Sequence, residues 1–290
     1  MNMNLFWIHQ LKTALKNQKN NHLIGLVQLI YKLSLEILKH HRSTMTTPIV
    51  GGDINSDKKL TVIVLNHKRP ENVNLIAQLI LRAGFVGKLI ISNNSQDYSI
   101  ESYIKIKDPR LILINQKEQS GVGIRFVLAK EFLSPYYICI DDDIFLHPAQ
   151  LQWLYWNLRQ SPEHTHGIYG AKIAPEKDPK NEWPFYHESN KTITIDILNG
   201  LFSFTREHLE EYFKLCSLLG ITDHKSLMNG EDIILSFSGI KKPLIHDIGP
   251  IWECASASLP GVALHVTRPH FYEERWGIFS KLEKIKPLKN

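Results

Sequence analysis

An alternation of apolar runs and amphipathic segments, which begins at residue 60, constrains the fold of this chain more than any other feature. Residues 60–65 read LTVIVL, an apolar and β-branched run that is typical of a strand buried on both faces. An amphipathic helical pattern with proline in its first turn follows over residues 70–82. The alternation continues with predicted strands at 88–92, 110–114 and 136–140 and a predicted helix at 123–133. This order predicts an α/β fold with a parallel sheet and crossover helices.

Three consecutive aspartates, Asp141, Asp142 and Asp143, follow directly after the last of these predicted strands. Adjacent carboxylates repel one another and are costly to remove from water. Hard divalent cations such as Mn²⁺ and Mg²⁺ prefer oxygen ligands, so an acidic triplet at the end of a buried strand favours a metal site. A solvated acidic turn is the structural alternative.

Polar residues also follow two other predicted strands. The first strand continues into Asn66-His-Lys-Arg69, and the second into Asn93-Asn94-Ser95. Ligands of open parallel sheets bind at the carboxyl ends of the strands. Three polar strand ends therefore predict a nucleotide-binding cleft.

The second half of the chain has a less regular pattern. Thr205 is suited to cap a helix, Glu231 and Asp232 open another, and Asn199-Gly200 follows a strand-like run. Glycine lets the backbone approach a ligand closely. The expected elements are a helix at 150–158, a loop at 174–191, a strand at 192–198, and helices at 205–218 and 229–237.

Basic residues are concentrated at the N-terminus. Residues 1–42 contain six lysines or arginines and a single glutamate, an excess equal to the formal net charge of +5 of the whole chain. Because the rest of the chain is neutral overall, we expect no nucleic-acid-binding surface on the folded body. We interpret residues 1–42 as a basic helical appendage, residues 43–59 as a linker, and residues 60–285 as one globular domain.

Residues 23–38 have apolar residues at helical spacing and predict an amphipathic helix. The segment is too short for a bilayer span and contains Lys32 and Glu36. Two interpretations stay open: packing on its own domain or a partner subunit, and peripheral attachment to an anionic membrane. No export signal is recognised, and the three cysteines form no CxxC pair, so we expect a cytoplasmic protein.

The order of these motifs resembles nucleotide-sugar-dependent glycosyltransferases of the GT-A fold, and most closely the exostosin-like family with its C-terminal transferase domain. The resemblance covers about residues 60–280. It is carried by Asn66-x-x-Arg69-Pro70, Asn93-Asn94, Gly-Val-Gly-Ile-Arg125, the triplet Asp141–Asp143, Asn199-Gly200 and Gly230-Glu231-Asp232-Ile233.

The resemblance implies a role for each matching residue. Asp143, together with Asp141, would ligate Mn²⁺ or Mg²⁺, with His270 as a further candidate ligand beside His265. Glu231 and Asp232 would be the catalytic carboxylates near the sugar. The implied donor-binding residues are Asn66, Arg69, Asn94, Arg125, Asp141, Asp142, Gly200 and Arg275.

The implied reaction moves a hexosyl or N-acetylhexosaminyl group from a UDP-sugar to a glycan or other hydroxyl acceptor, with retention of the anomeric configuration. An inverting enzyme with Asp232 as general base is the alternative. A haloacid-dehalogenase-like phosphatase is disfavoured, because Phe145 stands where that family needs threonine or valine. A non-catalytic sugar-binding module is the remaining alternative, which the intact Asp143, Glu231 and Asp232 disfavour.

Overall fold

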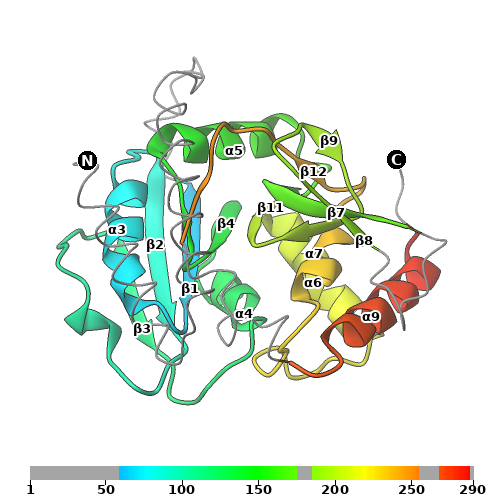
Figure 1. Cartoon of the computed structure of the whole chain (residues 1–290), viewed down its shortest axis with the longest axis horizontal. Coiled ribbons are helices and arrows are strands. Elements are labelled where there is room, and N and C mark those ends of the chain that lie inside the picture. The colour runs from blue at the N-terminus through cyan, green and yellow to red at the C-terminus, as the bar shows by residue number, and fades with distance from the viewer. Residues whose placement is uncertain (1–58, 175–184, 255–267, 288–290) are drawn as a thin grey trace, which may run out of the picture.

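The protein is represented by a computed structural model that describes residues 59–174, 185–254 and 268–287. An eight-stranded sheet with the strand order β3-β2-β1-β4-β11-β6-β12-β9 runs through it. Figure 1 shows β1–β3 and helix α3 on one side and helices α6, α7 and α9 on the other. The appendage predicted at 1–42 lies outside the described residues, as does the linker predicted at 43–59 except for Lys59.

The first half of the sheet is parallel, as the alternating pattern predicts. Strands β3, β2, β1 and β4 pair parallel to one another in that order. The elements of this half are β1 (Leu60–Asn66), α3 (Pro70–Leu81), β2 (Val86–Asn93), η1 (Ile100–Ser102), β3 (Leu111–Asn115), α4 (Ile124–Glu131) and β4 (Tyr136–Asp141). The predicted strands and helices of this half are confirmed, with boundaries that differ by a few residues.

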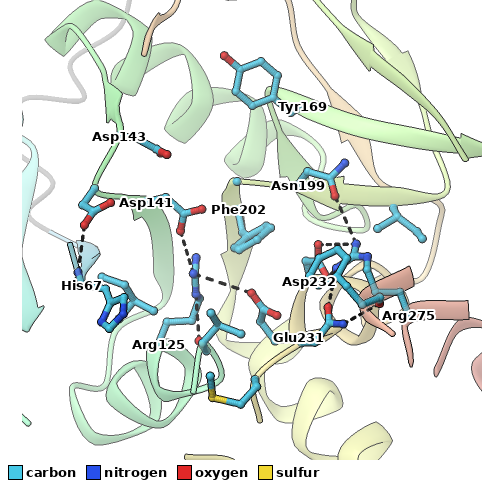
Figure 2. A pocket seen from close by; sticks show the side chains of 18 of the residues that line it. His67, Arg125, Asp141, Asp143, Tyr169, Asn199, Phe202, Glu231, Asp232 and Arg275 are labelled. Atoms are coloured by element: carbon cyan, nitrogen blue, oxygen red, sulfur yellow. Dashed lines mark hydrogen bonds and ion pairs between the residues drawn. The ribbon is translucent and has the colours of Figure 1, made fainter. Parts of the chain in front are cut away.

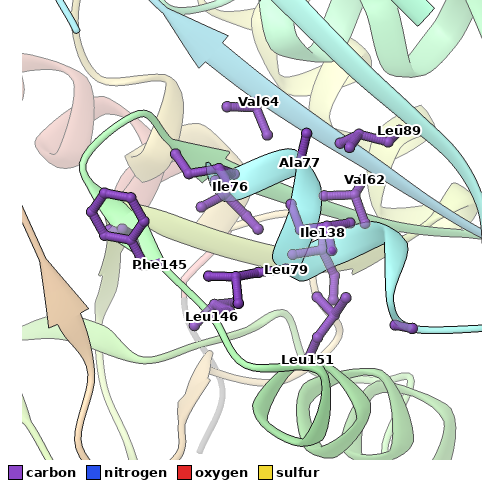
Figure 3. Packing of buried hydrophobic residues seen from close by; sticks show 14 of the residues in the cluster. Val62, Val64, Ile76, Ala77, Leu79, Leu89, Ile138, Phe145, Leu146 and Leu151 are labelled. Carbon is purple, nitrogen blue, oxygen red and sulfur yellow. The ribbon is translucent and has the colours of Figure 1, made fainter. Parts of the chain in front are cut away.

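Helices α3 and α4 line opposite faces of the parallel strands, which explains the continuous apolar runs. Val62 and Val64 of β1 belong to the same core cluster as Ile76 and other residues of α3 (Figure 3). Ile63, between these two valines, belongs to the second cluster with residues of α4. Because side chains alternate along a strand, β1 contributes apolar residues to both clusters.

The second half is built from shorter strands. Strand β11 pairs antiparallel with β4, and a separate sheet has the order β10-β7-β8. The elements up to α6 are β5 (Ile144–Phe145), α5 (Pro148–Gln160), β6 (His166–Gly167), β7 (Tyr169–Ile173), β8 (Phe185–Ser189), β9 (Ile193–Thr194), β10 (Ile197–Asn199), β11 (Leu201–Thr205) and α6 (Arg206–Leu218). They are followed by α7 (Glu231–Ser236), β12 (Leu244–Ile245), β13 (Trp252–Glu253) and α9 (Phe271–Ile285).

The single strand predicted at 192–198 is wrong, because the chain changes sheet in the middle of it. The backbone N–H of Ile195 donates to Pro243 O, on the side of β12, whereas that of Asp196 donates to Ala171 O of β7. The Asp196 carboxylate also accepts a hydrogen bond from Ile173 N at 2.8 Å. The run therefore forms two short strands, β9 and β10, in different sheets.

The remaining expectations for this half have mixed outcomes. The predicted helices at 150–158 and 205–218 are confirmed as α5 and α6, and Thr205 Oγ1 accepts the capping bond from His208 N. The predicted loop at 174–191 is wrong at its end, where β8 forms, and residues 175–184 lie outside the described part. The last predicted helix is the shorter α7, and α9 was not predicted. Among the described residues, no helix has the length and apolarity to cross a bilayer.

Candidate active site

A cavity of about 620 Å³ lies between the parallel half and the second half. Its lining comes from the ends of β1 and β4, the β7–β8 hairpin, the start of α7 and the first turns of α9. The structure brings both acidic clusters predicted from the sequence to this cavity, the aspartate triplet and the Glu231-Asp232 pair (Figure 2).

Asp142, the middle residue of the triplet, is turned into the protein. Its carboxylate accepts hydrogen bonds from Asn66 Nδ2 at 2.9 Å, His67 N at 3.0 Å and Arg69 Nη1 at 2.7 Å. Asn72 Nδ2 also donates to its backbone oxygen at 2.8 Å. Asp142 thereby holds Asn66, the last residue of β1, and Arg69, the N-cap of α3, against the end of β4.

Asp141 and Asp143 flank this buried residue and are more accessible. Their side chains are 36% and 20% exposed. Arg125 Nη2 contacts Asp141 Oδ1 at 2.8 Å, and Arg69 Nη2 lies 3.4 Å from Asp143 Oδ2. Burial raises the pKa of Asp143 to about 7, although the nearby Arg69 opposes this shift. Two carboxylates of the triplet thus face the cavity, and the third binds groups of the protein itself.

The two accessible carboxylates fit a hard divalent cation by their chemistry. Mg²⁺ and Mn²⁺ bind through one or two carboxylates and complete their shells with water and substrate phosphates. Within the described ranges, no group of three or more histidine, cysteine, aspartate or glutamate side chains is arranged to hold a metal. Asp141 and Asp143 would therefore hold the ion as two protein ligands, with the remaining positions left to other groups.

The structure does not bring His270, the further candidate ligand, to the triplet. His270 caps α9 with a left-handed φ of 57°, and its side chain is 77% exposed. Its ring Nδ1 pairs with Glu273 Oε2, and the residue does not line the cavity. His265 lies outside the described residues.

Arg125 connects the two acidic clusters. It sits in the first turn of α4, is 3% exposed, and stacks on the ring of Phe202 at 5.1 Å. Besides its contact with Asp141, its Nη2 lies 3.9 Å from Glu231 Oε1. Its buried Nη1 has no hydrogen-bond partner among the described residues. A buried donor without a partner is costly, so this atom is suited to an anionic ligand oxygen.

The Glu231-Asp232 pair opens α7 and faces Arg275 of α9. Arg275 donates from Nη1 to Asp232 Oδ1 at 2.8 Å and from Nη2 to Asp232 Oδ2 at 2.7 Å. Both side chains of this ion pair are less than 10% exposed. Both oxygens of Asp232 are therefore bound by one guanidinium in a fork arrangement.

Two glycines allow this arrangement of the backbone. Gly230 has a φ of 83°, and a Cβ there would come within 2.4 Å of Ile278 Cδ1 of α9. Gly200 has a φ of 67° and lines the cavity beside Asn199. Residues other than glycine rarely adopt such φ values, so glycine is favoured at both turns. Close packing of α7 on α9 brings Asp232 within reach of Arg275.

Burial also changes the proton affinity of Glu231. Burial together with the adjacent Asp232 raises the pKa of Glu231 to about 7, and Arg125 and Arg275 oppose the shift. A carboxyl group with such a pKa exchanges protons near neutral pH. The two members of the pair thus differ, because Asp232 is fixed by an arginine fork and Glu231 is not.

Asn94 lines the cavity at the end of β2, as the strand-end pattern predicts. Its Nδ2 donates to Ser120 O at 3.2 Å, and its buried Oδ1 has no partner within the described ranges. This oxygen is suited to a ligand donor. No sequence pattern points to other cavity residues, such as Tyr169, His187 and Phe202, which lie in short strands without a recognisable motif.

Comparisons with known proteins identify the family and the fold of this chain. The profile of the glycosyl transferase family 64 domain matches residues 60–275. A crystal structure of GalNAc-T7 with UDP, GalNAc and Mn²⁺ superposes with a TM-score of 0.53 at 11% identity, over 77% of this chain and 48% of that one. This chain therefore spans about half the length of that neighbour, and the likeness concerns the fold alone.

A second structure, CMP:2-keto-3-deoxy-manno-octonic acid synthetase with CTP, has a TM-score of 0.36 at 14% identity, over 54% of this chain and 78% of that one. A similarity this low carries no argument. No curated protein matches the sequence. Because the family profile covers most of the chain, the protein belongs to glycosyltransferase family 64 and is a glycosyltransferase with the GT-A fold.

Proposed function

We propose that this glycosyltransferase moves a sugar from a UDP-sugar to a hydroxyl group of a glycan or other acceptor, with the help of a divalent cation and with retention of configuration. The observation that carries the proposal is the arrangement of the two acidic clusters. Both face one cavity, and Arg125 lies between them. The UDP donor and the retaining outcome also follow from the resemblance to exostosin-like transferases.

In the proposed complex, the donor diphosphate binds at the triplet side of the cavity. Asp141 and Asp143 would hold Mn²⁺ or Mg²⁺, which stabilises the negative charge of a departing nucleoside diphosphate. The unpartnered Nη1 of Arg125 is suited to a phosphate or sugar oxygen beside that group. The unpartnered Oδ1 of Asn94 is suited to an N–H or O–H of the base or ribose.

The two hydrogen bonds from Arg275 to Asp232 favour retention over an inverting reaction with Asp232 as the base. An inverting enzyme needs a general base that takes the proton of the acceptor hydroxyl. Both Asp232 oxygens are already bound by Arg275, so Asp232 would have to leave its ion pair to act as that base. In the proposed reaction, the bond from the anomeric carbon to phosphate breaks, and the acceptor oxygen bonds to the same face. The acceptor proton passes to the departing phosphate oxygen, while the acids stabilise positive charge on the sugar.

The proposal is tested by calorimetric titration of UDP, GDP and CDP into the purified protein, once with Mn²⁺ and once with EDTA. We expect UDP to bind in the presence of Mn²⁺ and binding to be lost in EDTA. Absence of binding for all three nucleotides would contradict the donor class. Proton NMR of the first product formed from a UDP-sugar then measures its anomeric configuration. An inverted product would mean that Asp232 or Glu231 acts as the general base.

We also propose that the basic segment at residues 1–42 attaches the enzyme peripherally to the cytoplasmic face of an anionic membrane. The support is the amphipathic spacing of residues 23–38 and the excess of positive charge over residues 1–42. Sedimentation of the full chain with vesicles that contain or lack phosphatidylserine tests this. Ile30→Asp should abolish co-sedimentation with the anionic vesicles, and equal binding to both vesicle types would contradict the proposal.

A further inference from the structure

The ion pair between Arg275 and Asp232 joins two short stretches of chain that are 43 positions apart. Asp232 belongs to α7, which has only six residues, and Arg275 belongs to the second turn of α9. A one-ångström change in the position of a reacting group can lower turnover strongly. The direction of the Arg275 guanidinium therefore needs support from residues outside the ion pair.

Asn229 supplies this support from the residue before Gly230. Its Nδ2 donates to Phe271 O at 2.9 Å and to Glu274 Oε2 at 3.0 Å. An asparagine amide has two N–H groups, and these acceptors use both of them. The amide oxygen must then point the other way, and it lies 3.4 Å from Arg275 Nη1. The orientation of the Asn229 amide is thus set by its two acceptors in the first turn of α9.

Glu274, one of these acceptors, is itself held by a second arginine. Arg268 donates from Nε to Glu274 Oε2 at 2.8 Å and from Nη2 to Oε1 at 2.9 Å. This is the bidentate geometry that fixes a carboxylate most firmly. The hydrogen bonds between these two side chains raise the pKa of Arg268 and lower the pKa of Glu274, so both side chains stay charged.

Neither residue of this outer pair faces the donor cavity. Arg268 and Glu274 line a second cavity of about 590 Å³, which lies against the loop that follows α6. Asn229 lines both cavities and forms part of the wall between them. An effect of the outer pair on transfer would therefore pass through Asn229 and not through contact with the donor.

We propose that Glu274, held by Arg268, is a positioning residue, which orients Arg275 toward Asp232 through the amide of Asn229. This inference rests on the proposed function, because it takes Asp232 as a catalytic carboxylate. Loss of Glu274 frees one N–H of Asn229, so the amide can turn and withdraw its oxygen from Arg275. Asp232 would lose its alignment with the sugar, whereas the nucleotide-binding side of the cavity at Asp141–Asp143 would keep its geometry.

The test measures kcat, donor KM and UDP affinity for Glu274→Ala in the full chain. We expect kcat to fall by about tenfold, as for the loss of one hydrogen bond to a charged group, with donor KM and UDP affinity changed by less than about twofold. Glu274→Gln should recover most of kcat, because its side-chain oxygen still accepts from Asn229. Glu273→Ala is the matched control, since Glu273 is the neighbouring glutamate and pairs with the exposed His270; its kinetics should equal those of the wild type.

A double variant tests the route of the effect. If Glu274 acts through Asn229, adding Glu274→Ala to Asn229→Ala should cause no further loss of kcat, whereas additive losses would overturn the inference. Equal falls in kcat and UDP affinity without recovery by Gln would mean a general loss of structure and would also overturn it. If Glu274→Ala keeps the wild-type kcat while Asp232→Asn is inactive, the positioning role is refuted and the proposed function is not. Wild-type turnover of Asp232→Asn would refute the proposed function itself.

Discussion

The two acidic clusters of the cavity are both met by arginines, but the protein neutralises them to different degrees. In the triplet, Asp142 is buried among Asn66, His67 and Arg69, while Asp141 and Asp143 stay 36% and 20% exposed. In the other cluster, Asp232 is only 9% exposed and is bound at both oxygens by Arg275. Under the proposed function, the accessible carboxylates of the triplet would take up an external cation, whereas the paired Asp232 would orient the sugar.

The difference has a structural origin. The triplet follows a strand of the parallel sheet, and its arginines come from the adjacent ends of β1 and α4. The Glu231-Asp232 pair starts a short helix, and its arginine comes from α9, far along the chain. Arg125 lies close to a carboxylate of each cluster, Asp141 in one and Glu231 in the other. Under the proposed function, the triplet forms the donor-charge side of the cavity and the Glu231-Asp232 pair forms its sugar side, and the four predictions below test this division.

The largest effect is expected for Asp143→Ala, which removes an accessible carboxylate of the triplet. Metal-dependent UDP binding should be abolished and transfer should fall by about a thousandfold or more, since charge on the leaving diphosphate loses its counter-ion. Titration of UDP with Mn²⁺ measures binding independently of turnover. Unchanged UDP affinity would remove Asp143 from the metal site, and Asp108→Ala, distant from the cavity, serves as the control.

Asp232→Asn should have the next largest effect and should act only on the sugar side. We expect kcat to fall by about a hundredfold, because the fork with Arg275 and the charge near the sugar are both lost. UDP affinity in Mn²⁺ should stay within about twofold, which is the contrast with Asp143→Ala. Thermal unfolding should be measured in parallel, since an arginine left buried without its partner destabilises a protein. A parallel loss of UDP affinity would mean that the two sides are not separable.

Asp142→Asn tests the internal role of the middle aspartate. Asn66, His67 and Arg69 would lose a charged acceptor, so we expect the free energy of unfolding to fall by about 2 kcal/mol. Urea unfolding monitored by tryptophan fluorescence measures the change. A variant with wild-type stability but no UDP binding would instead make Asp142 a direct donor ligand, as the sequence resemblance implies.

The smallest effect concerns a group of buried histidines behind the sugar side. His166 Nδ1 lies 2.8 Å from His246 Nε2, and His166 Nε2 lies 2.9 Å from Ser161 O. Burial together with His164 lowers the pKa of His166 to about 4, although the hydrogen bond to Ser161 and the charge of Glu163 oppose the shift. Burial together with His166 and His164 lowers the pKa of His246 to about 3. Burial also lowers the pKa of the nearby His208 to about 4.

The sign of the resulting pH dependence follows from linkage. Below about pH 6.5, these histidines bind protons in the unfolded state but stay neutral in the folded state. The free energy of unfolding therefore falls as the pH drops from about 6.5 toward about 4. Between pH 7 and pH 5.5, His166 alone should account for about 1 kcal/mol of this loss. Urea midpoints of the wild type and of His166→Asn at the two pH values measure it. A variant that keeps the full pH dependence would exclude His166 as a contributor, and His270→Asn, at an exposed histidine, provides the control.

The parallel half could be predicted well from the sequence. Strands β1 to β4 and helices α3 and α4 have apolar periods that are local properties of the chain, and polar residues at or next to the ends of β1, β2 and β4 line the cavity. The position of the triplet at a strand end follows from the same local pattern. The physical reason is that side-chain periodicity and hydrophobic burial are set by neighbours in sequence.

The sequence by itself therefore determined the parallel α/β half and the acidic triplet at the end of β4. Only the tertiary structure decided that residues 192–198 divide between two sheets, that Asp142 turns inward, and that Arg275 closes on Asp232. These features depend on partners such as Pro243, Arg69 and α9, which lie far away along the chain. An ion pair or a strand pairing over such a separation leaves no period in the sequence, because it forms only when the packed sheets and helices bring its members together.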